Sequence, residues 1–321
     1  MKKYGKSLAL LLSVILCLSA CGGSSSSGTP AASTPAGSAP AADNSGRALN
    51  LSILAALTTL NPLNSNNLQD TMFFQQMNSG LFHVNEITKE VEPRVAEFWT
   101  ISEDGKTYTF KIRSNAKFHN GDPVKASDCV WSFNYAMGNP RINTYYTSVE
   151  SVEAADDSTF IMHLKQPNGA IFATLSNYNY ILSEREATEQ GDSFGTKLHT
   201  ASCGPYKLTR LDGLDSYWEL EAFEDYFLGA PAIKKLTYKP ISEASAGLIA
   251  FESGELDWYI APIANWDALS ANQNINSELV PANHQSYFII NYTNGELKDD
   301  NLRKAIAYAI DKDACNDVCY S

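Results

Sequence analysis

Alternation of hydrophobic and polar positions predicts β-strands in the first half of the folded chain. The apolar run Ala48 to Leu54 has the composition of a strand. Residues 99–113 alternate around Asp104-Gly105, a dipeptide typical of hairpin turns, and so predict two paired strands. Residues 149–164 predict a second hairpin that turns at Asp156-Asp157. Two hairpins close in sequence indicate antiparallel pairing.

Other segments carry apolar residues at helical spacing, and their polar ends look like caps. The predicted helices cover residues 69–82, 124–136 and 242–251, together with a segment capped by Asp299 or Asp300. A further strand is predicted for residues 287–291. Strands and helices mix without the regular alternation of a barrel or a fixed repeat, so we predict an α/β (mixed α+β) fold.

Gly204-Pro205 separates two differently patterned regions and predicts a domain boundary near residue 200. We expect Gly204 to adopt a backbone angle that other residues avoid.

The N-terminus has the pattern of an export signal. Residues 2–6 are basic, and residues 7–20 form an uncharged apolar run that ends in small side chains. The run is shorter than the roughly 20 residues that a membrane-spanning helix needs. Leu18-Ser19-Ala20-Cys21 resembles the bacterial lipobox, in which the cysteine is acylated. We therefore predict a signal peptide over 1–20 and lipidation of Cys21, which anchors the chain to a membrane.

The segment after Cys21 predicts a flexible tether. Of residues 22–46, 23 of 25 are Gly, Ser, Thr, Pro or Ala, a composition that cannot bury enough apolar surface to fold. We assign residues 21–47 to the lipidated cysteine and tether. A lipid, a tether and a folded body together predict an exported protein on the outer face of the bacterial cytoplasmic membrane.

Composition and motifs narrow the chemistry. A formal net charge of −12 argues against nucleic acid as a partner, because phosphate binding relies on clustered Lys and Arg. The five histidines are widely spaced, and the chain lacks metalloprotease, phosphate-loop and serine-hydrolase motifs. We therefore predict no catalytic residues, no metal site and no cofactor. A Ser-His-Asp site assembled only in space stays open at this point.

Aromatic residues in loop-like stretches are candidates for binding. Tyr and Trp offer large contact area with a polar tip, which suits a site that holds varied ligands. On this basis Tyr178 and Tyr180 are predicted to contact a ligand, with core packing as the alternative.

Several motifs then occur in a fixed order. Residues 91–136 contain P-x-V-A-E-x-W, S-x-D-G-x-x-Y-T-F-x-I-R and K-F-H-N-G-x-P, followed by a helix with Val130-Trp131-Ser132-Phe133. Later segments read CGPYKL from Cys203, FESGELD from Phe251 and LRKAIAYAID from Leu302. Together they resemble the family 5 extracellular solute-binding proteins, which are receptors of ABC importers for oligopeptides, dipeptides or nickel. Lys125 departs from the family's helix-capping Thr, a role that Ser127 could fill.

The resemblance implies a fold of the type II periplasmic-binding-protein kind with several lobes. Lobe I would comprise residues 48–84 and 200–284, with lobe II inserted as residues 85–199. Residues 285–321 would begin lobe III, and the chain would be an N-terminal fragment that is monomeric when complete.

The resemblance also implies a function and binding segments. The protein would capture a peptide or another small solute and deliver it to the transmembrane subunits of an ABC permease. Family ligands contact the segment after the first strand, the residues after G-E-L-D and the strand that leads into lobe III. Here these positions are Leu57, Thr58 and Thr59, then Trp258, Tyr259 and Ile260, then His284 and Ser286. The alternatives are a secreted hydrolase and a surface adhesion or chaperone-like protein with the same fold.

Overall fold

The computed structural model describes residues 48–279, 289–293 and 295–320. The predicted signal, Cys21 and the tether lie outside the described residues, as do His284 and Ser286. Among the helices in the described ranges, none has the length and apolar character needed to cross a bilayer.

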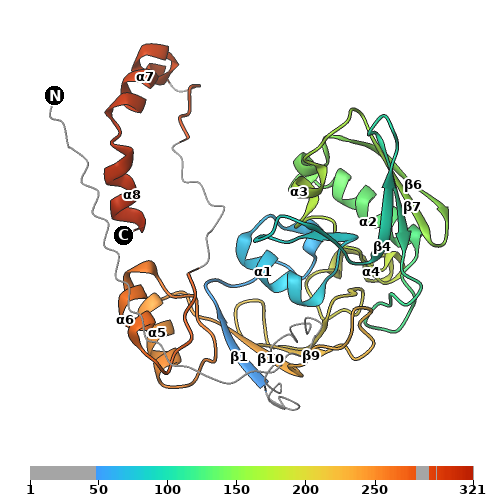
Figure 1. Cartoon of the computed structure of the whole chain (residues 1–321), viewed down its shortest axis with the longest axis horizontal. Coiled ribbons are helices and arrows are strands. Elements are labelled where there is room, and N and C mark those ends of the chain that lie inside the picture. The colour runs from blue at the N-terminus through green and yellow to red at the C-terminus, as the bar shows by residue number, and fades with distance from the viewer. Residues whose placement is uncertain (1–47, 280–288, 294, 321) are drawn as a thin grey trace, which may run out of the picture. The chain divides into compact units, whose positions relative to one another are not determined.

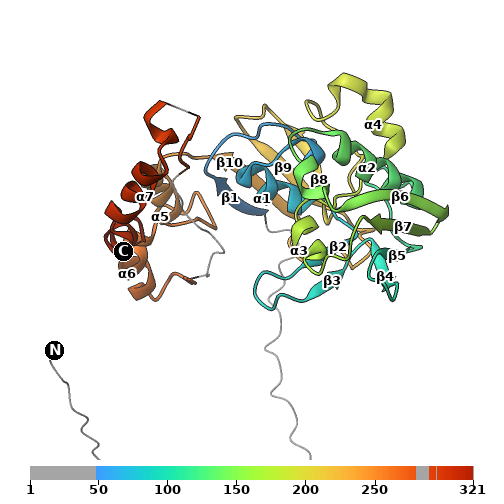
Figure 2. The same ribbon diagram turned by 90° about the horizontal axis from the view of Figure 1, so that it is seen from above.

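The first sheet joins strands that are far apart in sequence. Its order is β1 (Ala48–Ile53), β10 (Lys235–Pro240), β9 (Trp218–Ala222) and β8 (Tyr206–Leu211). Strand β1 runs parallel to β10, with Ala48 opposite Lys235, and the other pairs are antiparallel. Helix α1 (Leu68–Met77) lies beside this sheet (Figure 2), and the ring of its Phe73 packs edge-on against Trp218 at 5.5 Å. Burial of these rings joins the two distant segments.

The second sheet comes from one continuous stretch of sequence. Its order is β4 (Ala96–Ile101), β5 (Thr107–Ile112), β7 (Thr159–Leu164) and β6 (Val149–Asp156), all antiparallel. Both predicted hairpins are confirmed. Strands β5 and β7 bury every second residue, and α2 (Ala126–Gly138) covers that face (Figure 1), where Phe133 contacts Phe160 at 5.0 Å. A short pair, β2 (Phe82–Val84) with β3 (Val91–Pro93), completes the described strands.

The remaining helices are short. They are α3 (Ile171–Leu175), α4 (Glu184–Gln190), α5 (Ala244–Glu252), α6 (Trp266–Ala271), α7 (Asp300–Ala309) and α8 (Lys312–Tyr320). Single 3-10 turns span Pro62–Asn64, Asn143–Tyr146, Gly191–Ser193, Ile263–Asn265 and Gly295–Lys298. The Asp299 side chain caps α7 by accepting from the N–H groups of Asn301 and Leu302, as predicted.

Three local predictions are wrong. Helix α1 ends at Met77 instead of residue 82, and Phe82 enters β2. Residues 289–291, the described part of the predicted strand 287–291, do not form a strand. Gly204 is absent from the glycines with positive φ; instead, a Cβ there would lie 2.3 Å from the carbonyl carbon of Met77. Close backbone approach, and not an unusual backbone angle, therefore requires Gly204.

The unusual Lys125 does not prevent a normal helix start. The Lys125 N–H donates to the Asp128 carboxylate at 2.9 Å, so the third helical residue satisfies the cap position. Ser127 is not the capping residue, contrary to the sequence-based expectation. The other Asp128 oxygen accepts from the Glu184 N–H, which ties α2 to the start of α4.

The core runs through both sheets without a break, and it includes the buried Cys129 of α2. Strands of the first sheet fall in the ranges assigned above to lobe I, and strands of the second in the range assigned to lobe II. The lobe boundaries themselves stay a prediction.

Candidate functional site

Two of the predicted binding segments leave the first sheet at the same edge. Trp258 forms a parallel bridge with Leu51 of β1, and the Asp257 N–H donates to the Asn50 carbonyl at 2.9 Å. Because the two segments run in the same direction, residues 57–59 and 259–260 both follow the carboxyl end of that pairing, and Trp258 lies within it. Ligand sites in open α/β sheets lie at such strand ends.

A partly buried network of hydrogen bonds holds the segment that carries Trp258 against β1. The Asp257 Oδ2 atom accepts from the backbone N–H of Asn50 at 2.8 Å and from its side-chain amide at 3.1 Å. Thr237 of β10 donates to the Asn50 side-chain oxygen at 2.6 Å. One carboxylate therefore holds the segment that carries Trp258 against β1. Sequence analysis missed Asn50 and Thr237, and the aspartate of the G-E-L-D motif was the available signal.

Asp70 holds the other segment. This carboxylate is fully buried in the first turn of α1 and accepts from the Thr58 N–H at 2.9 Å and from the Thr58 hydroxyl. It also accepts from the Ser65 hydroxyl at 2.5 Å. The loop between β1 and α1 is thus clamped at both ends by one side chain. Sequence analysis did not identify Asp70, because the contact depends on how the loop folds back.

The six described candidates at this edge differ in accessibility. Leu57 and Thr59 are buried, and the Thr59 hydroxyl donates to the Gly195 carbonyl at 3.2 Å. The Tyr259 hydroxyl donates to the Ala244 carbonyl at 2.7 Å. Thr58 is exposed, Ile260 is half-buried, and the Trp258 side chain is 43% exposed. Thr58 and Trp258 are therefore accessible to a solute, whereas Leu57, Thr59 and Tyr259 support the loops.

Trp258 also borders an apolar cavity of about 410 Å³. Its other walls come from β1, from two residues of β10, from the middle of α1, and from Tyr206 and Ile233. A cavity of this size falls in the range of small-molecule sites. An indole at its border offers a flat apolar surface with one N–H donor.

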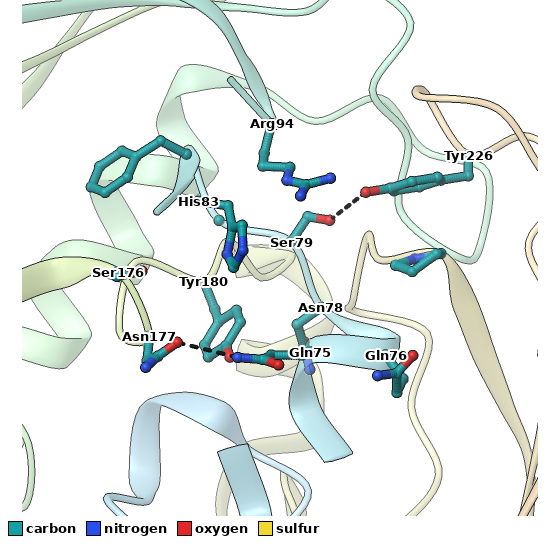
Figure 3. A pocket seen from close by; sticks show the side chains of 13 residues that line it. Gln75, Gln76, Asn78, Ser79, His83, Arg94, Ser176, Asn177, Tyr180 and Tyr226 are labelled. Carbon is teal, nitrogen blue, oxygen red and sulfur yellow. Dashed lines mark hydrogen bonds between the residues drawn. The ribbon is translucent and has the colours of Figure 1, made fainter. Parts of the chain in front are cut away.

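Tyr178 and Tyr180 lie away from this edge. The Tyr178 ring stacks on Tyr145 with centroids 3.7 Å apart. Tyr180 bridges to Gly80 beyond the carboxyl end of α1, whereas Thr58 bonds the first turn of that helix. Tyr180 lines a separate polar cavity, drawn in Figure 3. The structure thus does not bring these tyrosines to Thr58 and Trp258.

The ring contacts of three described histidines do not include a Ser or Cys side chain. His119 Nε2 lies 3.1 Å from the Gly204 carbonyl, and His199 Nε2 lies 3.2 Å from that of Leu60. His163 contacts Thr107 and Glu153 at 3.3 and 3.2 Å. Within the part of the chain that the structure describes, there is also no cluster of three or more potential metal ligands.

Comparison with known families decides the class. A family model described as bacterial extracellular solute-binding proteins, family 5 Middle, matches residues 90–321, well over half of the chain. The chain belongs to this family. Family 5 proteins are solute receptors and not enzymes.

Individual family 5 relatives support the assignment. The chain is 26% identical over 278 residues to the glutathione-binding protein GsiB of Pectobacterium atrosepticum, covering 84% of this chain and 53% of that protein. It is 27% identical over 281 residues to the dipeptide-binding protein DppE of Bacillus subtilis, covering 78% and 49%. The chain therefore spans about half the length of these curated relatives.

Solved family structures share the fold. MoaA of A. tumefaciens R10, solved with mannopinic acid, superposes with a TM-score of 0.75 at 26% identity. The match covers 85% of this chain and 57% of MoaA. The predicted mixed α/β fold of the type II binding-protein kind is confirmed.

Proposed function

We propose that this chain belongs to a lipid-anchored extracellular receptor that captures a peptide or related small solute and delivers it to an ABC permease. Family membership and the dipeptide- and glutathione-binding relatives support the ligand class. In this proposal lobe I is formed by residues 48–84 and 200–284, lobe II by 85–199, and lobe III begins at 285. The complete receptor is a monomer whose lobe closure signals to the permease.

The observation that carries the proposal is the shared exit of two loops at the end of β1. The Asp70 carboxylate holds the loop that carries Thr58, and the Asp257 carboxylate holds the segment that carries Trp258, while both residues stay exposed. Loop backbone at such an edge binds a peptide main chain without reading its side chains, and Trp258 adds apolar contact area. Ile260, His284 and Ser286 complete the proposed contact set. Leu57, Thr59 and Tyr259 contribute through the backbone.

Calorimetric titration with glutathione and with a dipeptide pool tests this site. Trp258→Ala should weaken binding at least ~10-fold, because removing an aromatic anchor costs over about 1.4 kcal/mol. Trp266→Ala, eight positions further on and in helix α6, is the matched control and should leave the affinity unchanged. Equal affinities for the wild type and Trp258→Ala would place the solute elsewhere.

The anchor is tested separately. Acylation of Cys21 should hold the expressed chain in the detergent phase of a Triton X-114 partition, because two or more acyl chains give stable membrane attachment. Cys21→Ala should move the chain to the aqueous phase. An unchanged partition of the Cys21→Ala chain would contradict lipidation, whatever the outcome of the titrations.

A further inference from the structure

A second cavity lies at the carboxyl end of α1, apart from the β1 edge. It measures about 240 Å³ and is enclosed by the carboxyl end of α1, strand β2, residues 176–180, Pro205 and Tyr226. Figure 3 shows Arg94 and His83 on one side and Gln75 and Gln76 across from them. These two glutamines are its only lining residues in common with the apolar cavity at Trp258.

Many of the lining polar groups are already paired. Asn78 accepts from Ser202 and donates to the Phe74 carbonyl at 2.7 and 3.1 Å. Gln75 donates to Asn177 at 3.3 Å, and Ser79 and Tyr226 share a hydrogen bond of 3.2 Å. These hydrogen bonds hold the lining side chains in place. The polar side chains that would contact a ligand are therefore those of Arg94, Tyr180 and Gln76.

The Tyr180 hydroxyl is buried and lacks a hydrogen-bond partner among the described residues. The Tyr180 side chain is 6% exposed. Leaving such a buried hydroxyl unpaired costs about 1–3 kcal/mol. This oxygen has almost no accessible surface, so an occupant of the cavity pairs with it, and removes that cost, only after a small shift of the ring.

The described lining contains one charged side chain, and that side chain has an acidic partner. Arg94 is the only Lys, Arg, Asp or Glu among the described lining residues, and its Nη2 donates to Glu92, outside the lining, at 3.0 Å. The Arg94 fork offers five N–H donors. Burial, followed by the neighbouring Arg94 charge, lowers the pKa of His83, so that ring is neutral at pH 7. The cavity thus combines one cation with neutral donors.

We propose that this cavity binds a small carboxylate of amino-acid size, at a site distinct from the peptide site. Arg94 pairs with the carboxylate, the Tyr180 hydroxyl donates a hydrogen bond, and Phe82, Tyr180 and Pro205 contact the carbon skeleton. At about 240 Å³ the cavity is smaller than the usual range for larger ligands, which favours a single small acid over a peptide. The inference does not depend on the proposed peptide function.

The test uses succinate as probe and succinamide as its uncharged match. Saturation-transfer NMR with the full chain should detect succinate and not succinamide. Arg94→Gln should weaken succinate at least ~10-fold, equivalent to one charge-assisted bond. Tyr180→Phe keeps the ring and should weaken succinate about threefold with no loss of thermal midpoint, because it removes an unpaired buried hydroxyl.

Control variants separate this site from the peptide site. Trp258→Ala should leave succinate binding unchanged, and Arg94→Gln should leave the affinity for the dipeptide pool unchanged. Equal binding of succinate and succinamide, or no succinate binding at about 10 mM, would show a water-filled structural cavity and overturn the proposal. Loss of succinate binding in Trp258→Ala would also overturn it, by placing the acid in the peptide site.

Discussion

The two four-stranded sheets are assembled from opposite kinds of sequence. The second sheet uses residues 96–164 in order, and short turns join β4 to β5 and β6 to β7. The first sheet pairs Ala48 of β1 with Lys235 of β10, so the whole second sheet lies between its two halves in sequence. Pairing between strands that are close in sequence closes short loops. Pairing between distant strands closes long loops, and it stabilises the protein only once the whole fold has formed.

The difference in strand pairing bears on where a ligand site can form. In the second sheet two of the three neighbouring strand pairs, β4 with β5 and β6 with β7, are joined by turns, and aromatic side chains pack on its buried face. At β1 two unrelated loops leave the sheet together, and two carboxylates, Asp70 and Asp257, hold them. A junction between distant segments thus provides loops for a ligand, and it depends on a few contacts that substitutions can break.

The largest predicted effect comes from Gly204→Val, where the chain returns to the first sheet. A Cβ at Gly204 would lie 2.3 Å from the Met77 carbonyl carbon and 2.4 Å from the Asn78 nitrogen. Backbone atoms cannot move aside as a side chain does, so we expect a loss of about 3 kcal/mol or more in unfolding free energy. Urea denaturation measures the loss.

Gly138→Ala is the control in the region of the second sheet. A Cβ at Gly138, the last residue of α2, would meet nothing within 4 Å. We expect a change within about 0.5 kcal/mol. An unchanged urea midpoint for Gly204→Val would show that α1 and the returning segment can separate without cost.

The contrast also explains what the sequence could predict. The hairpins of the second sheet follow from alternation and from Asp-Gly and Asp-Asp turns, which are local signals. The carboxyl end of α1 was missed because Leu81 and Phe82 are buried from an extended segment and happened to continue the helical spacing. The need for glycine at 204 depends on Met77, over one hundred residues earlier, and local pattern cannot reveal it.

The candidate site was predictable only in part. The family motifs selected Thr58 in the loop after β1 and Trp258 after the G-E-L-D segment, but nothing local shows that Asp70 and Asp257 hold them. Tyr180 was chosen for its aromatic character, and the structure gives it a different cavity, whose Arg94 and His83 sequence analysis did not propose. Contacts between distant side chains require the fold.

The second largest effect is expected from lowering the pH, which should weaken the contacts between the two sheet regions. His119 and His199 are each 4% exposed, and burial lowers both pKa values, that of His119 to about 3. Between pH 6.5 and 3 the His119 ring binds more protons in the unfolded chain than in the folded chain, so its contribution to stability falls as pH falls through this window, and His199 acts in the same direction. At pH 5, about 1.5 pH units below the unfolded pKa, His119 alone should cost about 2 kcal/mol.

Denaturation midpoints at pH 7 and pH 5 measure this effect. His119→Gln removes the titrating ring and should reduce the pH dependence, although the variant is less stable at pH 7 because the hydrogen bond to the Gly204 carbonyl changes. His163→Gln is the control, since His163 is half-buried on the second sheet. The same slope in His119→Gln as in the wild type would assign the pH dependence to other groups.

Asp257→Ala should have a smaller effect that is confined to the first sheet. It removes two hydrogen bonds to Asn50, and we expect a loss of about 1–3 kcal/mol together with weaker peptide binding. Glu255→Ala, two positions earlier, breaks an exposed ion pair with Lys239 and should cost at most about 0.5 kcal/mol. Thermal melts and titrations of both variants provide the comparison, and equal losses would remove the special role of Asp257.

The smallest effect is expected at the outer edge of the second sheet. The Trp258 segment pairs with the outer edge of β1, whereas β4 pairs only with β5 among the described strands. Ile101 of β4 is 46% exposed, so Ile101→Thr should change the unfolding free energy by less than about 0.5 kcal/mol. An open apolar edge favours pairing between chains, so the variant should scatter less light at high concentration. A loss above 1 kcal/mol would instead mean that the edge of β4 is covered, as the outer edge of β1 is by the Trp258 segment.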